Sequence, residues 1–335
     1  MPRVSVLLPV RDAATWLPDC LRSLAGQSLA DHEVVAIDDG STDGSGALLD
    51  EAAAQDPRLR VFHTPRLGLV AALNRAAALA RSDGLARMDA DDVAHPARLE
   101  CLWNRISNGP RVDILASRVV LAGEVGRSNA GLRAYVDWTN GLLDHGAMAR
   151  ERFVDAPLVH PSVMLRCEAL KRLGGYREFD GPEDYDLWLR AFERGCRFAK
   201  LAEPLLTWRD SAGRLTRIGS RYAPDRFLAL KLAALLRGPL RDERPIVVWG
   251  AGPIGKRWSQ LLREAGRRVA AFVEVDPLKI GQRIHSAPVV GIAAVGSLTG
   301  SLHLAAVGQR GARERMRVAA TQMGLVEGQD WWPLA

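Results

Sequence analysis

The first ninety or so residues alternate between short apolar runs and helical patterns, and this alternation constrains the fold more than any other feature of the chain. Four runs read as strands: Val4–Val10, His32–Ile37, Leu59–His63 and Gly84–Met88. Helical patterns lie between them, at Trp16–Ala25, Ala47–Ala54 and Gly68–Ala80. Strands that alternate with helices in this way predict an α/β fold built on a doubly wound sheet.

Polar residues follow three of these strands directly. The groups are Val10-Arg11-Asp12, Asp38-Asp39 and Asp89-Ala90-Asp91. In doubly wound sheets, ligands bind beyond the carboxyl ends of the strands, so the three groups are expected to converge on one site.

The stretch Met88–Asp92, read as M-D-A-D-D, places three carboxylates within four residues. One interpretation is a solvated acidic turn, because aspartate side chains hydrogen-bond to nearby backbone amides. The other is a set of oxygen ligands for a divalent cation, Mn²⁺ or Mg²⁺, that could in turn hold a diphosphate. The residues of this stretch alone leave both interpretations open.

The bulk properties exclude several classes of protein. No uncharged apolar run reaches the roughly 18 residues of a membrane-spanning helix. The formal net charge of +6 suits anionic ligands or an anionic membrane surface, but the basic residues are not interleaved with aromatic ones, so nucleic acid is not an expected partner. The four cysteines are scattered without metal-binding spacing, which indicates reduced thiols and a cytoplasmic protein.

A second nucleotide-binding pattern lies near the C-terminus. Gly250, Gly252 and Gly255 form a G-x-G-x-x-G motif between a strand at Ile246–Trp249 and a helix, and Glu274 follows at the distance of a ribose-binding acid. This predicts a small Rossmann-like α/β domain over residues 239–335, after a first domain over residues 1–238. It also resembles the nucleotide-binding-like domain of some sugar acyltransferases. Two roles stay open for this domain: it could bind a nucleotide such as NAD, or it could be a packing module.

Three stretches in the first domain carry a more specific resemblance. They are V-S-V-L-L-P-V, V-A-I-D-D-G-S-T-D-G-S and R-M-D-A-D-D-V-A-H-P-A-R-L. Together they resemble the amino-terminal half of family 2 inverting glycosyltransferases, which have the GT-A fold, a doubly wound mixed sheet of the nucleotide-diphospho-sugar transferase type. The resemblance departs at Arg11-Asp12, where the family usually has an aromatic residue and an asparagine.

The resemblance implies a donor site for a UDP- or GDP-type nucleotide sugar. The residues that it assigns to nucleotide binding are Pro9, Val10, Asp12, Asp39, Arg66, Gly68, Asp89 and Ala90. It implies a divalent cation on Asp91, with Asp89 as a further ligand. Asn74 matches a family asparagine, for which a role in helix packing is equally open.

The segment E-D-Y-D-L-W-L-R resembles the part of the family that carries the catalytic base. The resemblance implies that Asp184 is the base and that Glu183 binds the acceptor or orients Asp184. Without the resemblance, the two acids could simply lie in the first turn of a helix, where the helix dipole favours negative charge. His160, Trp188 and Arg209 are assigned to the acceptor or the diphosphate, with a structural histidine and a core tryptophan as alternatives. Arg214 and Arg217 are further candidates for the diphosphate.

The leading prediction is therefore a metal-assisted inverting glycosyltransferase that moves one sugar to a hydroxyl on a glycan or lipid-linked acceptor in cell-surface glycan biosynthesis. Such a protein is expected in the cytoplasm, and a peripheral position at the inner face of the membrane stays open for it. An NAD(P)-type oxidoreductase or epimerase acting on nucleotide sugars, and a non-catalytic nucleotide-sugar-binding protein, are the alternatives.

Overall fold

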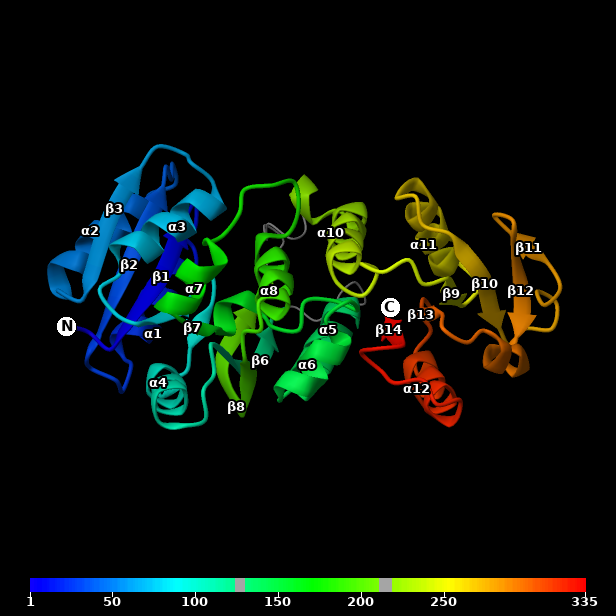
Figure 1. Ribbon diagram of the computed structural model, residues 1–335. Helices are drawn as coiled ribbons and strands as arrows, with labels where there is room; N and C mark the ends of the chain where they lie inside the picture. Colours follow the sequence, from blue (N-terminus) through cyan, green and yellow to red (C-terminus); the bar gives the residue numbers. More distant parts are fainter. Residues whose placement is uncertain (124–129, 211–218) are drawn as a thin grey trace. The chain divides into compact units, whose positions relative to one another are not determined.

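The computed structural model describes residues 1–123, 130–210 and 219–335 (Figure 1). The chain forms two compact units. The first contains Met1–His145 and Ala156–Ala223, and the second contains Gly146–Asp155 and Pro224–Ala335. None of the helices within the described ranges is long and apolar enough to span a bilayer.

The first unit is built on a mixed sheet with the strand order β3-β2-β1-β4-β7-β6-β8-β5. Its parallel half consists of β1 (Val4–Val10), β2 (His32–Asp39), β3 (Leu59–Thr64) and β4 (Gly84–Arg87), drawn at the blue and cyan end of the chain in Figure 1. All seven residues of β1 are buried, as its unbroken apolar run predicts for a central strand. The expected doubly wound α/β sheet is confirmed.

The other half of this sheet reverses direction. Strand β7 (Met164–Arg166) runs antiparallel to both β4 and β6 (Ile114–Ala122), β8 (Phe198–Arg209) runs parallel to β6, and the short β5 (Val93–Ala94) pairs antiparallel with β8. This reversal makes the sheet mixed, as the GT-A resemblance implies.

The first three helices, α1 (Leu17–Ala25), α2 (Ser45–Gln55) and α3 (Leu69–Leu79), follow the predicted order. The unit also contains α4 (Arg98–Asn108), α5 (Ala130–Gly141), α7 (Cys167–Leu173) and α8 (Glu183–Glu193). Helix α6 (His145–Glu151) belongs to the second unit from Gly146 onward. Helix α1 buries Leu17, Cys20 and Leu24 on one face, the spacing of an amphipathic helix.

The largely apolar sequence L-V-H-P-S-V-M-L-R of Leu158–Arg166 predicts one strand, and this prediction is wrong. His160–Ser162 forms a 3₁₀ turn, η2, and only Met164–Arg166 pairs in the sheet. Pro161 explains the difference, because proline has no N–H to donate to a strand ladder. A second 3₁₀ turn, η3 (Ser220–Tyr222), ends the unit.

The second unit contains a smaller sheet with the order β11-β12-β10-β9-β13-β14. Its elements are α10 (Pro224–Arg237), β9 (Ile246–Trp249), α11 (Pro253–Glu264), β10 (Val269–Glu274), β11 (Arg283–Ile284), β12 (Ala287–Gly291), η4 (Ile292–Ser297), β13 (Leu302–Ala305), α12 (Ala312–Gln322) and β14 (Trp331–Pro333). The strands run parallel except at the β11–β12 hairpin. A strand, a glycine-rich turn, a helix and a parallel strand follow in the order that predicts a Rossmann-like unit.

The glycine motif has the close packing that its sequence requires. Gly250 has a φ of 104°, and a Cβ atom on Gly255 would lie 1.8 Å from the carbonyl oxygen of Gly250. Only glycine fits at this second position, because helix α11 starts directly against the turn.

A segment from the middle of the chain belongs to the second unit. Glu151 is buried there and accepts from Arg313 Nη1 at 2.8 Å and Arg317 Nη2 at 2.7 Å, and the ring of Phe153 packs edge-on against Trp332. Helix α10 also belongs to this unit, since Lys231 Nζ donates to the carbonyls of Val154 and Leu334. A domain boundary at residue 238 stays a prediction. In the structure, the last part of the first unit ends at Ala223, and the second unit continues from Pro224.

Candidate active site

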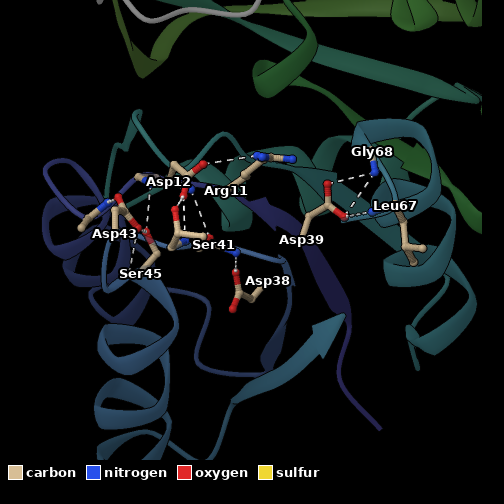
Figure 2. A network of polar contacts seen from close by, with 12 residues as sticks. Arg11, Asp12, Asp38, Asp39, Ser41, Asp43, Ser45, Leu67 and Gly68 are labelled. Atoms are coloured by element: carbon tan, nitrogen blue, oxygen red, sulfur yellow. Dashed lines mark hydrogen bonds and ion pairs between the residues drawn. The ribbon is translucent and has the colours of Figure 1, made fainter. Parts of the chain in front are cut away.

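The loops after β1 and β2 are joined by side-chain hydrogen bonds (Figure 2). Asp12 has a left-handed φ of 45°; its N–H donates to Ser41 Oγ at 3.1 Å, and its Oδ1 accepts from the N–H of Thr42 at 2.8 Å. An ion pair of 3.3 Å joins Asp12 to Arg11. The two loops therefore form one polar rim, to which Pro9 and Val10 lead as buried residues at the end of β1.

Asp43 and Ser45 secure the other end of this rim. Asp43 Oδ2 accepts from the N–H of Ala14 at 2.8 Å, and its Oδ1 accepts from Ser45 Oγ at 2.6 Å. Ser45 Oγ also accepts from the N–H of Ala13 at 2.9 Å. The Ser and Asp residues of the D-D-G-S-T-D-G-S stretch thus hold the loop after β1 in a single conformation.

Asp39 is turned toward a third loop. Its carboxylate accepts from the backbone N–H of Leu67 at 2.6 Å and from that of Gly68 at 2.9 Å (Figure 2). Gly68 has a φ of 93°, which glycine adopts without strain. Arg66 is an exposed residue of the same loop. Of the donor residues predicted after β2 and β3, the structure therefore brings Asp39, Arg66 and Gly68 together.

The acidic stretch after β4 forms a compact cluster. Carboxylate oxygens of Asp89, Asp91 and Asp92 lie within 4.8 Å of one another; the first two residues are half-buried and Asp92 is buried. Carboxylate oxygens at this spacing are the donor set that Mg²⁺ and Mn²⁺ prefer. These three residues fit a divalent cation. Ala90, between them, is buried in the core.

Two buried arginines that were not predicted from the sequence lie next to this cluster. Arg87 is 2% exposed and pairs with Asp89 through Nη2 at 2.5 Å. Arg98 is fully buried, donates to the carbonyls of Arg87 and Pro161, and has its pKa lowered to about 10 by burial. The signal for Arg87 was a charged residue inside an otherwise apolar strand, which needs a partner when buried.

Asp92 and Arg209 connect the cluster to strand β8. The N–H of Arg209 donates to Asp92 Oδ1 at 2.9 Å. The Arg209 side chain turns toward α1, where Nη2 pairs with Asp19 at 2.8 Å and the guanidinium lies 5.2 Å from the ring centre of Trp16. Arg214 and Arg217, the other predicted diphosphate residues, lie outside the described residues.

The two acids at the start of α8 differ in environment. Glu183 is buried and accepts from the hydroxyl of Tyr222 at 2.7 Å, and burial raises its pKa. Asp184 is half-buried and accepts from the N–H of Tyr185 at 2.7 Å. Asp186 is ion-paired with Arg190 at 2.7 Å inside the unit. This pair accounts for Asp186 as a structural residue.

His160 lies next to Glu183, with Nδ1 3.8 Å from Oε1. Its Nε2 is 2.9 Å from the hydroxyl of Tyr176, and burial lowers the pKa of His160 well below its ordinary value, so the ring is neutral near pH 7. Trp188 has no exposed surface and packs its ring edge against His160. The structure thus places Trp188 in the core behind His160.

Tyr176, a third residue that was not predicted from the sequence, is held by Asn74. The Nδ2 of Asn74 donates to the carbonyl of Tyr176, and the N–H of Tyr176 donates to Asn74 Oδ1, both at 2.9 Å. Asn74 therefore has the packing role that was left open for it.

Arg87 links the acidic cluster to the acid-bearing helix. Burial opposes the charge of Arg87, but the negative charges of Asp89 and Glu183, among others, outweigh this and raise its pKa. The charge of Arg87 therefore acts both on the predicted cation site and on Glu183 at the start of α8.

The glycine loop of the second unit has its acid turned inward. Glu274 Oε2 accepts from the N–H of Ala251 at 3.0 Å, and Lys279 Nζ lies 3.4 Å from the same oxygen. Gly250, Gly252 and Gly255 lie around this contact at the start of α11. Burial opposes the ionisation of Glu274, but hydrogen bonds from three backbone amides outweigh it and lower its pKa.

Comparison with solved structures places the first unit in a known fold. The S. aureus TarS fragment 1–349 in complex with UDP-GlcNAc superposes with a TM-score of 0.54 at 19% identity, over 70% of this chain and 66% of that one. The mannosyltransferase PcManGT from Pyrobaculum calidifontis, in complex with GDP-Man and Mn²⁺, gives 0.51 at 22% identity, over 76% and 66%. These similarities confirm the GT-A fold.

Sequence comparison identifies relatives. A putative glycosyltransferase, EpsE, of Bacillus subtilis is 29% identical over 247 residues, which are 72% of this chain and 85% of that protein. The UDP-Gal:alpha-D-GlcNAc-diphosphoundecaprenol beta-1,3-galactosyltransferase of Escherichia coli is 28% identical over 226 residues, 66% of this chain and 80% of that enzyme. The family described as "Glycosyl transferase family 2" matches residues 5–174, half of the chain and nearly all of the strand-end loops described above. The chain is thus a glycosyltransferase and belongs to glycosyl transferase family 2.

Proposed function

We propose that this protein transfers one sugar from a nucleotide-diphosphate sugar to a hydroxyl acceptor, with inversion at the anomeric carbon. The observation that carries the proposal is a chain of contacts from the carboxylate cluster to the helix that begins with two acids. Arg87 pairs with Asp89, and Arg98 donates to the carbonyls of Arg87 and Pro161. His160, next to Pro161, lies 3.8 Å from Glu183 at the start of α8. Inverting transfer needs both parts: a charged site for the departing diphosphate and a carboxylate for the acceptor proton.

The donor half is assigned to the rim after β1 and β2 and to the loop held by Asp39. In this proposal Pro9, Val10 and Asp12 line the nucleoside, and Asp39 orders the backbone of Leu67 and Gly68 beside it. Exposed Arg66 contacts the diphosphate as a charged donor. The Escherichia coli relative named for UDP-Gal and the neighbour in complex with GDP-Man support a UDP- or GDP-type donor.

The cation is assigned to Asp91 and Asp89, with Asp92 fixing the turn through its hydrogen bond to the backbone of Arg209. Mn²⁺ or Mg²⁺ held there would offset the charge of the diphosphate leaving group. The Mn²⁺ in the mannosyltransferase neighbour supports this assignment.

The base is assigned to Asp184. Its carboxylate takes the proton of the acceptor hydroxyl while the hydroxyl oxygen bonds to the anomeric carbon and the bond to the diphosphate breaks. Glu183, buried and with a raised pKa, holds Tyr222 and lies beside His160, and we assign these residues to shaping the acceptor side. Trp188 acts from the core, by supporting His160.

The setting that we propose is cell-surface glycan assembly, with a glycan or lipid-linked acceptor and peripheral contact with a membrane. The named function of the Escherichia coli relative supports this. Membership of the family favours transfer over an oxidoreductase or epimerase reaction. For the loop Gly250–Gly255, a nucleotide site stays a proposal.

The test is a panel of nucleotide sugars incubated with the full-length protein and Mn²⁺. We expect slow hydrolysis of one donor in the absence of acceptor, and calorimetric binding of the matching nucleoside diphosphate. If no donor is hydrolysed and no nucleoside diphosphate binds, the proposal is wrong.

A further inference from the structure

The second unit contains a cavity that the proposed sugar transfer does not use. It has a volume of about 530 Å³ and lies where β10 begins at Val269 and β12 begins at Ala287. The glycine loop Gly250–Gly255 follows the carboxyl end of β9. Because β9, β10 and β12 run parallel, the cavity and the glycine loop lie at opposite edges of the same sheet.

The charged side chains that line this cavity are all positive. Its basic residues, which we call the arginine pocket, are Arg263, Arg267, Arg268, Arg283 and His285. Among the described residues that line it, none is acidic. Two nearby carboxylates have other partners: Glu264 accepts from Gln260, and Asp242 pairs with Arg244 at 2.8 Å.

Two of the arginines are held in place by neutral acceptors. Arg267 donates to the backbone carbonyls of Leu240 and Asp242, and Arg283 Nη2 donates to the carbonyl of Ser286 at 2.5 Å. A carbonyl orients a guanidinium without neutralising it, so both positive charges stay available to an anion. Ordered guanidinium groups lose less rotamer freedom on binding, and their planar fork favours bidentate recognition of phosphate oxygens.

The hairpin that carries Arg283 adopts an uncommon backbone. His285 and Ser286 have φ values of 46° and 72°, and neither is glycine. His285 Nδ1 lies 3.1 Å from Ser259 Oγ of α11, which fixes the hairpin over the helix. A two-residue turn between paired strands requires positive φ at both of its residues, so the turn sets the direction of the strand that carries Arg283.

Helix geometry explains only part of the cluster. Arg263 lies in the last turn of α11, where a cation offsets the negative end of the helix dipole. That explanation does not extend to Arg283 on the separate hairpin, nor to Arg267, which binds the segment before β9. Two separate chain segments, residues 263–268 and 283–285, thus bring positive charge to one cavity.

We propose that the arginine pocket binds phosphate groups that together carry at least two negative charges. The volume exceeds the need of a single phosphate and lies in the range of small-ligand sites, about 300–1,000 Å³. The phosphates can belong to a soluble diphosphate or to anionic lipid headgroups, and the experiment separates these sources. The proposal is independent of the sugar-transfer chemistry, which is assigned to the first unit.

The test compares two full-length double variants with the same loss of charge. Arg268→Gln/Arg283→Gln removes two exposed arginines of the pocket, and Arg310→Gln/Arg315→Gln removes two exposed arginines at the start of α12. Inorganic pyrophosphate is titrated by calorimetry in EDTA. Vesicles with equal parts of phosphatidylglycerol and phosphatidylcholine are co-sedimented with each protein and compared with pure phosphatidylcholine vesicles. Unchanged thermal unfolding midpoints control for folding.

We expect the pocket variant to bind at least one probe about tenfold more weakly or worse, and the control variant to bind like the wild type. A loss confined to pyrophosphate identifies a soluble diphosphate, and a loss confined to the anionic vesicles identifies lipid headgroups. If neither probe binds the wild type, or if both variants bind each probe equally well, the proposal is overturned.

Discussion

Both sheets of this protein present acidic residues at the carboxyl ends of parallel strands, but the partners of these acids differ between the two units. In the first unit, Asp12 and Asp39 bind the amides of other loops, and three further aspartates converge after β4. In the second unit, Glu274 binds the amide of the glycine loop beside it and pairs with Lys279.

The difference lies in how the charge is balanced. The aspartate cluster of the first unit has three carboxylates against two buried arginines, Arg87 and Arg98, so an added cation would be stabilised there. Glu274 already accepts from the amides of Ala251 in the glycine loop and of Val275 beside it, and the ammonium of Lys279 lies 3.4 Å away. Two similar strand-end motifs can therefore differ in their need for a ligand, and the comparison can be tested by changing one acid at a time.

The largest effect is expected at Asp184, the proposed catalytic base in the first unit. Asp184→Asn should reduce kcat by about 10²–10⁴-fold, because asparagine cannot accept the acceptor proton. Donor affinity should change little, as measured by calorimetry with the matching nucleoside diphosphate. Glu193→Gln, in the last turn of the same helix, is the matched control. A variant with wild-type turnover would remove Asp184 as the base.

The next effect is expected at the cation site. Asp91→Asn should weaken Mn²⁺-dependent binding of the nucleoside diphosphate by roughly 10–100-fold, because a charged ligand is lost. EDTA should produce a comparable loss in the wild type. Asp31→Asn, at an exposed ion pair with Arg3, is the control. Unchanged metal dependence in Asp91→Asn would move the ligand to another residue.

A smaller effect is expected from the loop held by Asp39. Asp39→Asn replaces a charged acceptor of the Leu67 and Gly68 amides, so the loop becomes less ordered and KM for the donor should rise about tenfold. Steady-state kinetics should show a kcat that falls less than KM rises. Asp50→Asn, an exposed acid of α2, is the control. An unchanged KM would separate this loop from donor binding.

The smallest effect is expected in the second unit. Glu274→Gln should lower the free energy of unfolding at pH 7 by about 1–2 kcal/mol, because three backbone amides lose a charged acceptor. The lowered pKa means that the carboxylate stabilises the fold above its unfolded-state pKa of about 4.3. This contribution is lost as the pH falls through the lower folded-state pKa.

Denaturant unfolding at several pH values measures this contribution. The gap between the wild type and Glu274→Gln should narrow in acid, whereas Glu264→Gln, at an exposed helix position, should match the wild type throughout. A gap that does not vary with pH would show that the charge of Glu274 is not what stabilises the loop.

The sequence predicted the parts of the fold that depend on local patterns. The strand Val4–Val10 has the predicted bounds, and β9 also matches its predicted range. The convergence of strand-end acids followed from the rule that parallel strands end at one edge. The 3₁₀ turn at His160–Ser162 was missed because its apolar flanks read as one strand despite Pro161.

Long-range pairings could not be predicted in this way. The bonds from Asn74 to Tyr176 and from Tyr222 to Glu183 join residues far apart in the chain, and no periodic pattern encodes them. Arg87 was missed for the same reason, since its partners come from separate elements. The site was thus predictable where it lies on strand ends, but not where tertiary packing supports it.

The membership of Gly146–Asp155 in the second unit sets an order of events for a chain leaving the ribosome. Glu151 and Phe153 are synthesised long before Arg313, Arg317 and Trp332, their partners in the native fold. Until Trp332 has emerged, a carboxylate and an aromatic ring that end up buried face water or chaperones. This segment lies between two parts of the first unit in the sequence, so its packing can be completed only after the second unit has been synthesised.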